Sequence, residues 1–443
     1  MISQQSIWYL CCFHVVNVIL ITNSEIEREY KMKFCELQPD EFESFVNEHF
    51  SHYTQSRIHY DYKVEHNEPV HIVGVKEGDE VLAACLLTSA PAFKYFNYFY
   101  SHRGPVMDYS NKTLVDLFYT ELRGYLKSHN GLFALIDPHI IMNYRDHDGN
   151  ITESNDVEGF IEQMEGLGYH HRGFPVGYSD DSQARFLSVL NLEGKSEDEL
   201  LKEMEYKTRR NIKKTYEMGV RLRDLSIEET DKFFELFQMA EDKHGFSFRD
   251  FDYFVKMQKI YKDQCRLVLS YIDLDEHLDI LRKDLKQKED EYNKEKLKLD
   301  ENPGFRKLRN KVEQLAKAVD KEKKKVTEIE ALKQTDGRIL HLASALYIHN
   351  EHELYYLSSG SNPKYNQFMG PYNMMFEMIK YAKSLNLKTY NFYGVTGVFT
   401  EDAEDYGVLK FKKGFNAHIE EYIGDFILPL SPFYKLYELR QKL

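Results

Sequence analysis

The sequence predicts an α+β fold of two related lobes, with an antiparallel coiled-coil hairpin of helices inserted in the second lobe. One observation is an order of strand, Gly-Pro, amphipathic helix and strand that occurs twice. Another is a highly charged heptad pattern that interrupts the second half of the chain. The length of 443 residues also exceeds what a single core usually accommodates. A cleft between two lobes is a common place for a ligand.

The first copy of the pattern follows Met32. Its strands are short and apolar, and its first helix has apolar residues at the spacing of a helix face. Its predicted elements are a hairpin of strands over 70–77 and 81–88, an aromatic strand ending at Arg103-Gly104-Pro105, a helix over 112–130, a strand over 131–139 and a helix over 156–169.

The second copy lies near the C-terminus. Residues 353–362 and 388–395 are predicted strands, and Gly370-Pro371 opens an amphipathic helix between them. Because the spacing differs between the copies, the pattern indicates, without proving, a duplicated α+β unit.

Residues 273–335 are predicted to form the coiled-coil arm. Steps of four and three residues connect mostly apolar positions on both sides of a Pro-Gly turn at 301–304, which is the signature of two packed antiparallel helices. Lys288, Glu295 and Glu322 interrupt the apolar row. The arm is interpreted as a spacer or dimerisation device in preference to a contact for a long charged partner such as tRNA, because charged coiled-coil faces are usually just solvated.

The composition limits the possible functions. A formal net charge of -14 argues against holding nucleic acid by overall charge, although a local basic groove remains compatible with it. The five cysteines lack metal-ligand spacing, so reduced thiols in a cytosolic compartment are expected. The motifs of zinc, phosphate-loop and dinucleotide sites do not occur, and no metal or cofactor is predicted.

Residues 1–31 are predicted to be a non-native extension upstream of Met32. Their apolar stretch, residues 7–22, is short for a membrane span and lacks the features of a signal peptide. A membrane-surface anchor is the alternative.

Two lysines lie between Phe411 and Phe415, just after a cluster of four acids. The segment is predicted to be a strand, on which Lys412 and Lys413 would face opposite sides. Lys412 is then expected to point into the cleft, while the acids shape the loop and keep the cleft mouth polar. The alternative is an edge strand whose lysines only discourage pairing. The four acids are Glu401, Asp402, Glu404 and Asp405.

Five segments resemble the FemA/FemB family of staphylococcal aminoacyltransferases that build the interpeptide bridge of peptidoglycan. The resemblance runs from Met32 nearly to the C-terminus, and the segment from Tyr390 is the most distinctive. The matching segments are SHRGPVMDY, TRRNIKK, SSGSNPKYNQFMGPY, YNFYGVTGVFTEDAEDYGVLKFKKGFN and EEYIGDF.

The resemblance implies two GNAT-like lobes and the helical arm. The predicted boundaries are 32–175 for the first lobe, 176–272 and 336–425 for the second, 273–335 for the arm and 426–443 for a C-terminal helix. It also implies transfer of glycine, with serine as the alternative, from aminoacyl-tRNA to the side peptide of a lipid II-type precursor. The expected location is the cytoplasm, peripheral at the inner membrane face, with homodimers or sister transferases as partners. Aminoacyl-tRNA is a co-substrate, and no cofactor is needed.

The resemblance also assigns roles to residues. Lys412 is expected to stabilise the oxyanion or a substrate phosphate. Apart from the resemblance, Asp108 follows RGPVM and is expected either to orient or deprotonate the acceptor amine or, equally, to cap the following turn. The expected substrate-binding residues are Lys63, Arg249 and Tyr253 for phosphate and Tyr356 and Tyr393 for the acceptor pocket. Arg249 and Tyr253 are expected to share one helical face. Without the resemblance, ordinary surface or core roles would be preferred for these residues.

The segment 207–214, KTRRNIKK, is a basic patch expected on a helix. Few acids are interleaved, so contact with tRNA or lipid phosphates is predicted. Its candidate residues are Arg209, Arg210, Lys213 and Lys214. Two other functions stay open: an acetyl-CoA-dependent N-acetyltransferase, disfavoured because neither lobe has the glycine-rich pyrophosphate turn, and a non-catalytic scaffold built around the arm.

Overall fold

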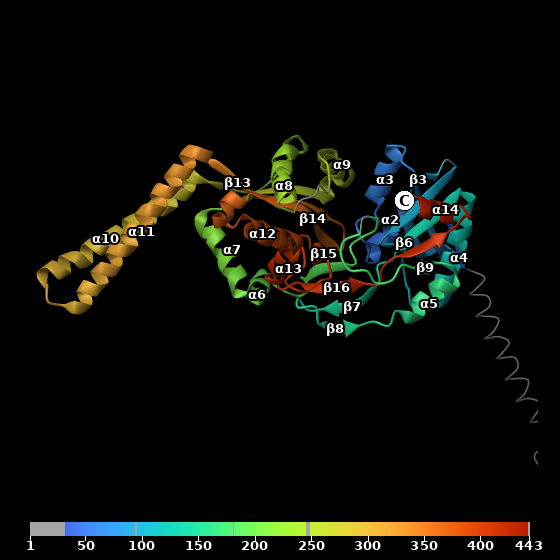
Figure 1. Cartoon of the computed structure of the whole chain (residues 1–443), viewed down its shortest axis with the longest axis horizontal. Helices are drawn as coiled ribbons and strands as arrows, with labels where there is room; N and C mark the ends of the chain where they lie inside the picture. Colours follow the sequence, from blue (N-terminus) through green and yellow to red (C-terminus); the bar gives the residue numbers. More distant parts are fainter. Residues whose placement is uncertain (1–31, 94, 180, 245–248, 442–443) are drawn as a thin grey trace, which may run out of the picture.

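The computed structural model describes residues 32–93, 95–179, 181–244 and 249–441. The predicted extension, residues 1–31, lies outside the described residues. The predicted α+β class is confirmed: the chain has two lobes, each built on a mixed sheet, and a long helical hairpin that projects from the second lobe (Figure 1). Among the described residues, every helix is too short or too polar to traverse a bilayer.

The sheet of the first lobe contains the predicted hairpin of β2 and β3. Its hydrogen-bonded order is β1-β2-β3-β4-β6-β17-β9, with β5 beside β3, and only β4 and β6 are parallel. The strands are β1 Met32–Glu36, β2 Val70–Glu77, β3 Glu80–Phe93, β4 Phe96–His102, β5 Val106–Met107, β6 Gly131–Asp137, β9 His170–His171 and β17 Phe426–Pro429. The helices are α2 Pro39–Glu48, α3 Arg57–Glu65, α4 Lys112–Ser128, α5 Glu158–Gly166 and α14 Tyr434–Gln441.

The sheet of the second lobe has the order β11-β12-β13-β14-β15-β10-β16-β7-β8, and only β14 and β15 are parallel. The strands are β7 Ile141–Arg145, β8 Ile151–Ser154, β10 Phe186–Asn191, β11 Arg221–Asp224, β12 Cys265–Asp273, β13 Ile339–His349, β14 Glu353–Ser361, β15 Thr389–Val395 and β16 His418–Tyr422. The helices are α6 Glu197–Glu203, α7 Tyr206–Met218, α8 Thr230–His244, α9 Phe251–Tyr261, α12 Gly370–Ser384 and α13 Tyr406–Lys413, with short 3-10 turns at Ile227–Glu229, Lys262–Gln264 and Pro363–Phe368.

The two lobes repeat one scheme. In each, antiparallel strands lead to a single parallel pair, and further antiparallel strands complete the sheet. Along the chain, helix α4 connects the two parallel strands of the first lobe, and α12 connects those of the second. The repeated order read from the sequence therefore corresponds to a repeated architecture.

Two segments pair outside the lobe in which the sequence places them. Strands β7 and β8, within the predicted first lobe, join the second sheet through β16. Strand β17 joins the first sheet beside β6. The predicted C-terminal helix over 426–443 is therefore wrong in its extent, because only α14 is helical there among the described residues. Sequence order alone does not reveal this exchange, because hydrogen bonds between strands form across any separation along the chain.

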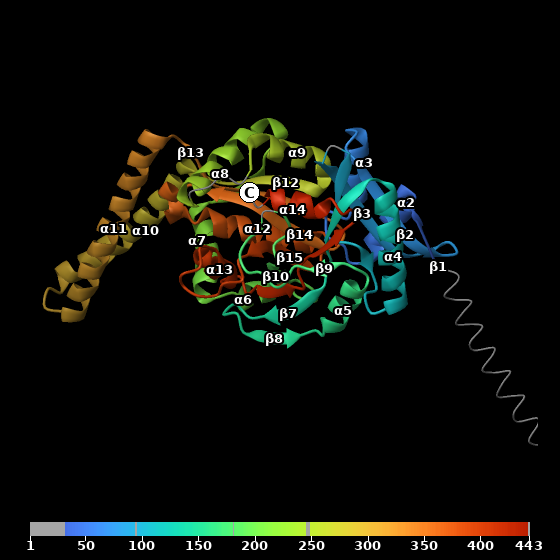
Figure 2. The ribbon, with the colours of Figure 1, turned by 45° about the vertical axis from the view of Figure 1, so that its right-hand side comes forward.

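Helices cover both faces of the second sheet. On one face, Ile212 of α7 and Met375 of α12 pack with Tyr347 of β13. On the other face, Phe233 of α8 and Phe254 of α9 pack in a core that also includes Tyr53 of the first lobe. The second core therefore joins the lobes, and Figure 2 shows α9 beside α3 at this junction.

The predicted arm is confirmed as α10 Leu274–Glu301 and α11 Arg306–Asp336. Its buried positions follow the predicted row, including the polar ones: Glu322 receives Lys288 across the hairpin at 2.6 Å. A charged layer of this kind fixes the register of a coiled coil. The arm continues directly from the second sheet, since β12 ends at Asp273 and α10 begins at Leu274. At this base, Arg338 donates to both carboxylate oxygens of Asp273.

Candidate active site

The predicted strand around Lys412 is wrong, because residues 406–413 form helix α13. Asp405 is its N-cap residue and Gly414 its C-cap residue. These are ordinary start and stop signals of a helix, and they were present in the sequence. The aromatic residues favoured a strand, but they are buried because this segment packs against the core covered by α7 and α12.

Lys412 is a buried cation, with only 3% of its surface exposed. Its Nζ donates to the carbonyl oxygens of Gly394 at 2.7 Å and Tyr393 at 3.2 Å. Burial lowers the pKa of Lys412 to about 7, and the opposing attraction of Asp405 is smaller. Lys413, by contrast, is half-buried and pairs with Asp148 at 2.6 Å. The two neighbours therefore have different environments.

The carbonyls that receive Lys412 belong to an irregular part of β15. This strand pairs with β14 only from Thr389 to Asn391. Beyond that point its register with β10 shifts, and Tyr393 has a φ of 64°, which is rare for a residue other than glycine. The side chain of Asn391 accepts the backbone N–H of Tyr393 at 2.8 Å and holds this bend.

Asp405 organises the loop before α13. Its carboxylate accepts the backbone N–H of Thr396 at 2.8 Å and the hydroxyl of the same residue at 2.6 Å. The hydroxyl of Tyr178 reaches Asp405 at 3.3 Å and the Gly394 carbonyl at 3.4 Å. Of the four predicted loop acids, Asp405 is buried and the other three are exposed, so Asp405 alone shapes the loop from inside.

The bend also turns the Tyr393 side chain toward the first lobe. Its hydroxyl donates to Gln183 Oε1 at 2.6 Å, and the Gln183 backbone N–H donates to the Tyr100 hydroxyl at 3.1 Å. Tyr100 in turn donates to the buried Asp137 carboxylate at 3.0 Å, beside Arg103. A continuous chain of polar contacts thus connects the carbonyls around Lys412 to the end of the parallel pair in the first lobe.

Three predicted phosphate-binding residues lie near the junction of α3 and α9. The expectation that Arg249 and Tyr253 share a helical face is wrong, because Arg249 precedes α9. The two side chains still meet, since the Arg249 guanidinium lies 4.8 Å from the centre of the Tyr253 ring. Lys63 lies on α3 and pairs with Glu68 at 2.5 Å. Tyr253 and Tyr393 both pack on the core that joins the lobes.

Tyr356 lies on the opposite face of the second sheet from Tyr393. It packs with Tyr347 on the core covered by α7 and α12, at 5.4 Å between ring centres. Its hydroxyl donates to Ser359, and burial raises its pKa to about 12. The structure therefore does not bring Tyr356 into the group around Tyr393.

Asp108 is exposed and closes a turn. Its carboxylate accepts the Ser110 backbone N–H at 2.9 Å and the Ser110 hydroxyl at 2.6 Å. These hydrogen bonds lower the pKa of Asp108, which weakens it as a base. The geometry favours the turn-capping alternative, and the role of Asp108 toward the acceptor amine stays a prediction.

The basic segment forms helix α7 as expected, but its residues divide into two groups. Arg209 folds back on the end of α6 and donates to the Met204 carbonyl at 3.0 Å and to the Lys202 carbonyl. The other three candidates point to solvent, and only Lys213 has an ion pair among the described residues, at 3.8 Å to Glu217. The exposed candidates are Arg210, Lys213 and Lys214.

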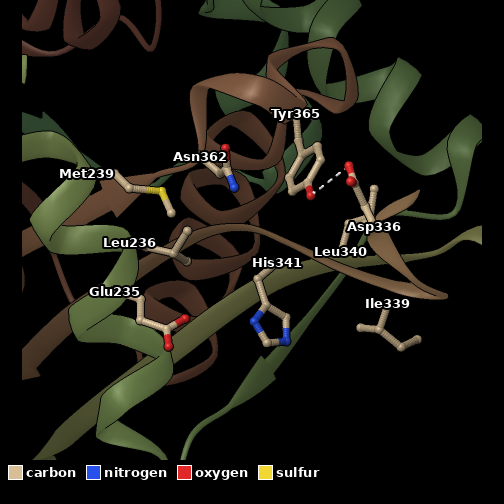
Figure 3. A pocket seen from close by; sticks show the side chains of 9 residues that line it. All are labelled: Glu235, Leu236, Met239, Asp336, Ile339, Leu340, His341, Asn362 and Tyr365. Atoms are coloured by element: carbon tan, nitrogen blue, oxygen red, sulfur yellow. Dashed lines mark hydrogen bonds between the residues drawn. The ribbon is translucent and has the colours of Figure 1, made fainter. Parts of the chain in front are cut away.

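A pocket of about 180 Å³ lies at the base of the arm, and its lining contains none of the predicted site residues (Figure 3). The hydroxyl of Tyr365 donates to Asp336 at its edge, at 3.1 Å. Its lining comes from α8, the end of α11, β13 and the turn before α12: Glu235, Leu236, Met239, Asp336, Ile339, Leu340, His341, Asn362 and Tyr365.

Sequence reasoning missed the polar chain around Tyr393. Gln183 and Asp137 have no motif of their own, and their function depends on strands that meet only in the folded chain. The signal for Tyr178 was equally absent, because it lies in an irregular segment far from Asp405 in sequence.

Comparison with known proteins adds a family to this geometry. A sequence model described as the FemAB family matches residues 37–442. The aminoacyltransferase FemA of Staphylococcus epidermidis is 40% identical over 415 residues, covering 93% of this chain and 100% of that protein. FemA of Staphylococcus aureus is 39% identical over 421 residues, covering 93% and 99%. A crystal structure of FemX matches with a TM-score of 0.76 and 24% identity over 91% of this chain and 99% of that one, which shows a shared fold.

Proposed function

Because the chain belongs to the FemAB family and is an aminoacyltransferase, we propose that it transfers an amino acid from aminoacyl-tRNA to the side-peptide bridge of a lipid-linked peptidoglycan precursor. Glycine is the proposed amino acid, with serine as the alternative. The observation that carries the proposal is the burial of Lys412 where the parallel strands of the second lobe separate.

The reaction makes modest demands on the protein. The neutral amine of the acceptor attacks the ester carbonyl, a C–N bond forms, and the C–O bond to the tRNA ribose breaks. The amine loses a proton, and the ribose oxygen gains one. Alignment of the two substrates supplies much of the rate, and a fixed cation stabilises the oxyanion that forms in between. In the proposed mechanism, Lys412 leaves one carbonyl partner and donates to that oxyanion.

The remaining assignments come from the family resemblance, and the position of each residue supports or weakens them. Arg249, Tyr253 and Lys63 would hold acceptor phosphate at the α3–α9 junction, since guanidinium and ammonium groups bind phosphate oxygens strongly. Tyr393 would contact the acceptor peptide next to Lys412. Tyr356, on the other face, and the exposed Asp108 are weaker candidates for that pocket because of the contacts described above.

The tRNA would contact the solvent-facing cations of α7, namely Arg210, Lys213 and Lys214. Arg209 is assigned a structural role at the end of α6. Because the acceptor is anchored in lipid, the enzyme would work in the cytoplasm at the inner membrane face, as a homodimer or with sister transferases.

A defined transfer assay tests the proposal. Purified protein is mixed with glycyl- or seryl-tRNA and with precursors that carry no, one or three bridge residues, and product mass is measured. Extension of one precursor class by one charged tRNA is expected. Failure with every combination, or acetyl transfer from acetyl-CoA in a parallel reaction, would contradict it.

A further inference from the structure

Two lysines from different lobes share a single carboxylate where α3 and α9 lie side by side (Figures 1 and 2). Lys63, near the end of α3, contacts Glu68 Oε2 at 2.5 Å. Lys256, on α9, contacts the other oxygen, Oε1, at 2.7 Å. Each oxygen of Glu68 is thus held by one lobe, and the carboxylate bridges the two.

This cluster has more positive than negative charge. Two ammonium groups face one carboxylate, and Arg249 stacks on Tyr253, which precedes Lys256 by about one turn of α9. The ammonium of Lys256 also lies 5.6 Å from the centre of the Tyr62 ring on α3. The two lysines hold the pKa of Glu68 at about 2 against the effect of burial, so the carboxylate is ionised at neutral pH.

A neighbouring histidine adds an unused polar atom. His59 of α3 shares a hydrogen bond of 2.8 Å with the Tyr261 hydroxyl through Nδ1. Its Nε2 is buried without a partner among the described residues. His59 precedes Lys63 by four residues on α3, which places both side chains on the same face of that helix. Buried polar atoms normally have partners, so Nε2 of His59 offers an additional hydrogen-bonding atom to a group bound here.

We propose that Glu68 occupies the position of a substrate phosphate, and that Lys256 is a phosphate-binding residue which the second lobe adds to the acceptor site. The proposal rests on the proposed function. A diphosphate offers more charge and more acceptor oxygens than one carboxylate, so it displaces Glu68 and takes both lysines. The substrate phosphate then contacts Lys63 of the first lobe and Lys256 of the second. Binding of the acceptor thereby links the two lobes.

The chemistry recognised is a phosphate or diphosphate anion, which either the acceptor or the tRNA backbone could supply. The test compares Lys256→Gln with Lys259→Gln, an exposed lysine one turn further along α9 without an ion pair among the described residues. Binding of inorganic pyrophosphate is measured by calorimetry. KM is measured for a soluble diphosphate-linked acceptor, for the same peptide without diphosphate, and for aminoacyl-tRNA. Thermal melting verifies that each variant is folded.

Lys256→Gln is expected to weaken pyrophosphate binding and to raise KM for the diphosphate acceptor by about 10- to 100-fold. The kcat for this acceptor should change little. The peptide without diphosphate, the tRNA and the Lys259 variant should show no such change. Glu68→Gln should tighten pyrophosphate binding, because the competing charge is removed.

Three results would overturn the proposal: equal behaviour of the two lysine variants, weaker pyrophosphate binding by Glu68→Gln, or a rise confined to the KM for tRNA. Pyrophosphate binding is measured without turnover, so it decides the proposal even if no transfer occurs. Loss of the proposed function and loss of this site are therefore distinguishable.

Discussion

The two lobes share a strand order but differ at the parallel pair in the middle of each sheet. In the first lobe, β4 and β6 stay paired from Asn97 opposite Gly131 to His102 opposite Asp137. In the second lobe, β14 and β15 pair only over Thr389 to Asn391, although both strands continue. One unit therefore has a closed centre and the other an open one.

Different groups occupy the ends of these pairs. In the first lobe, Asp137 is buried and accepts hydrogen bonds from Tyr100 and the Arg103 backbone. Burial raises the pKa of Asp137 to about 7, and these contacts close the end of the sheet. In the second lobe, the separated strand leaves carbonyl oxygens that receive Lys412. The two lobes therefore share a strand order, but only in the second do the parallel strands separate early and leave carbonyl oxygens that accept hydrogen bonds from the buried Lys412.

The largest expected effect comes from removing that cation. Lys412→Ala should lower turnover by about 100- to 1,000-fold, the usual loss when one donor to a developing oxyanion is deleted. Transfer assays at saturating substrates measure the effect. Lys413→Ala is the matched control, since its ion pair with Asp148 is near the surface and such pairs contribute little to stability. Equal losses in both variants would contradict the contrast between the lobes.

A second prediction uses the lowered pKa of Lys412. The unfolded chain holds this proton up to about pH 10.5, but the folded protein releases it at about 7. Between these values the unfolded state binds more protons, so stability rises with pH, and the penalty of the buried charge is fully present below pH 7. The free energy of unfolding should therefore rise relative to Lys412→Met by up to about 1.4 kcal/mol per pH unit.

Denaturant titrations of both proteins between pH 7 and 10 test this linkage. Subtracting the Met variant cancels the titration of all other groups. A difference that stays constant across this range, or falls as pH rises, would show that folding does not lower the pKa of Lys412.

Two glycines sharpen the comparison further. In the second lobe, a Cβ on Gly394 would lie 2.8 Å from the Ala184 Cβ and 3.2 Å from the Tyr178 ring. Gly394→Ala should therefore cost about 1–3 kcal/mol through overpacking. In the first lobe, Gly124 is on α4 with no atom near its would-be Cβ, so Gly124→Ala should stabilise the helix by up to about 1 kcal/mol.

Thermal or denaturant unfolding of the two alanine variants measures both signs. Transfer activity should fall only with Gly394→Ala, because that change displaces the carbonyl that holds Lys412. If Gly394→Ala were as harmless as Gly124→Ala, the strand would have more freedom at this point than the contacts indicate.

Much of the fold was predictable because its signals are local. The hairpin of β2 and β3, helix α4 and the arm each follow from apolar spacing and turn residues within one segment. The elements that were predicted wrongly depend either on pairing between distant segments or on local signals that compete with each other. Strand β17 crosses to the first sheet through partners almost 300 residues away in sequence, and no periodicity encodes that choice. Helix α13 is short, so its aromatic residues outweighed its caps.

The site was predictable only in part. Lys412, Arg249, Tyr253 and Lys63 are predicted from the resemblance, since a lone lysine or tyrosine has no distinctive pattern, and their roles stay predictions. Glu68 and Lys256 were not predicted, because their ion pair forms only when α9 of the second lobe packs beside the first lobe. A bend such as that at Tyr393 likewise depends on register with β10, which the sequence of β15 alone does not determine.

The smallest expected effect concerns the hydroxyl of Tyr178. Its contacts with Asp405 and the Gly394 carbonyl, at 3.3 and 3.4 Å, are long for hydrogen bonds. Tyr178→Phe keeps the ring over Gly394 and should cost about 0.5–1 kcal/mol of stability, with less than about a tenfold loss of turnover. Tyr178→Ala, which also removes the ring, should cost more in both measurements. A Phe variant as impaired as Lys412→Ala would mean that the hydroxyl, rather than the buried ammonium, distinguishes the open lobe from the closed one.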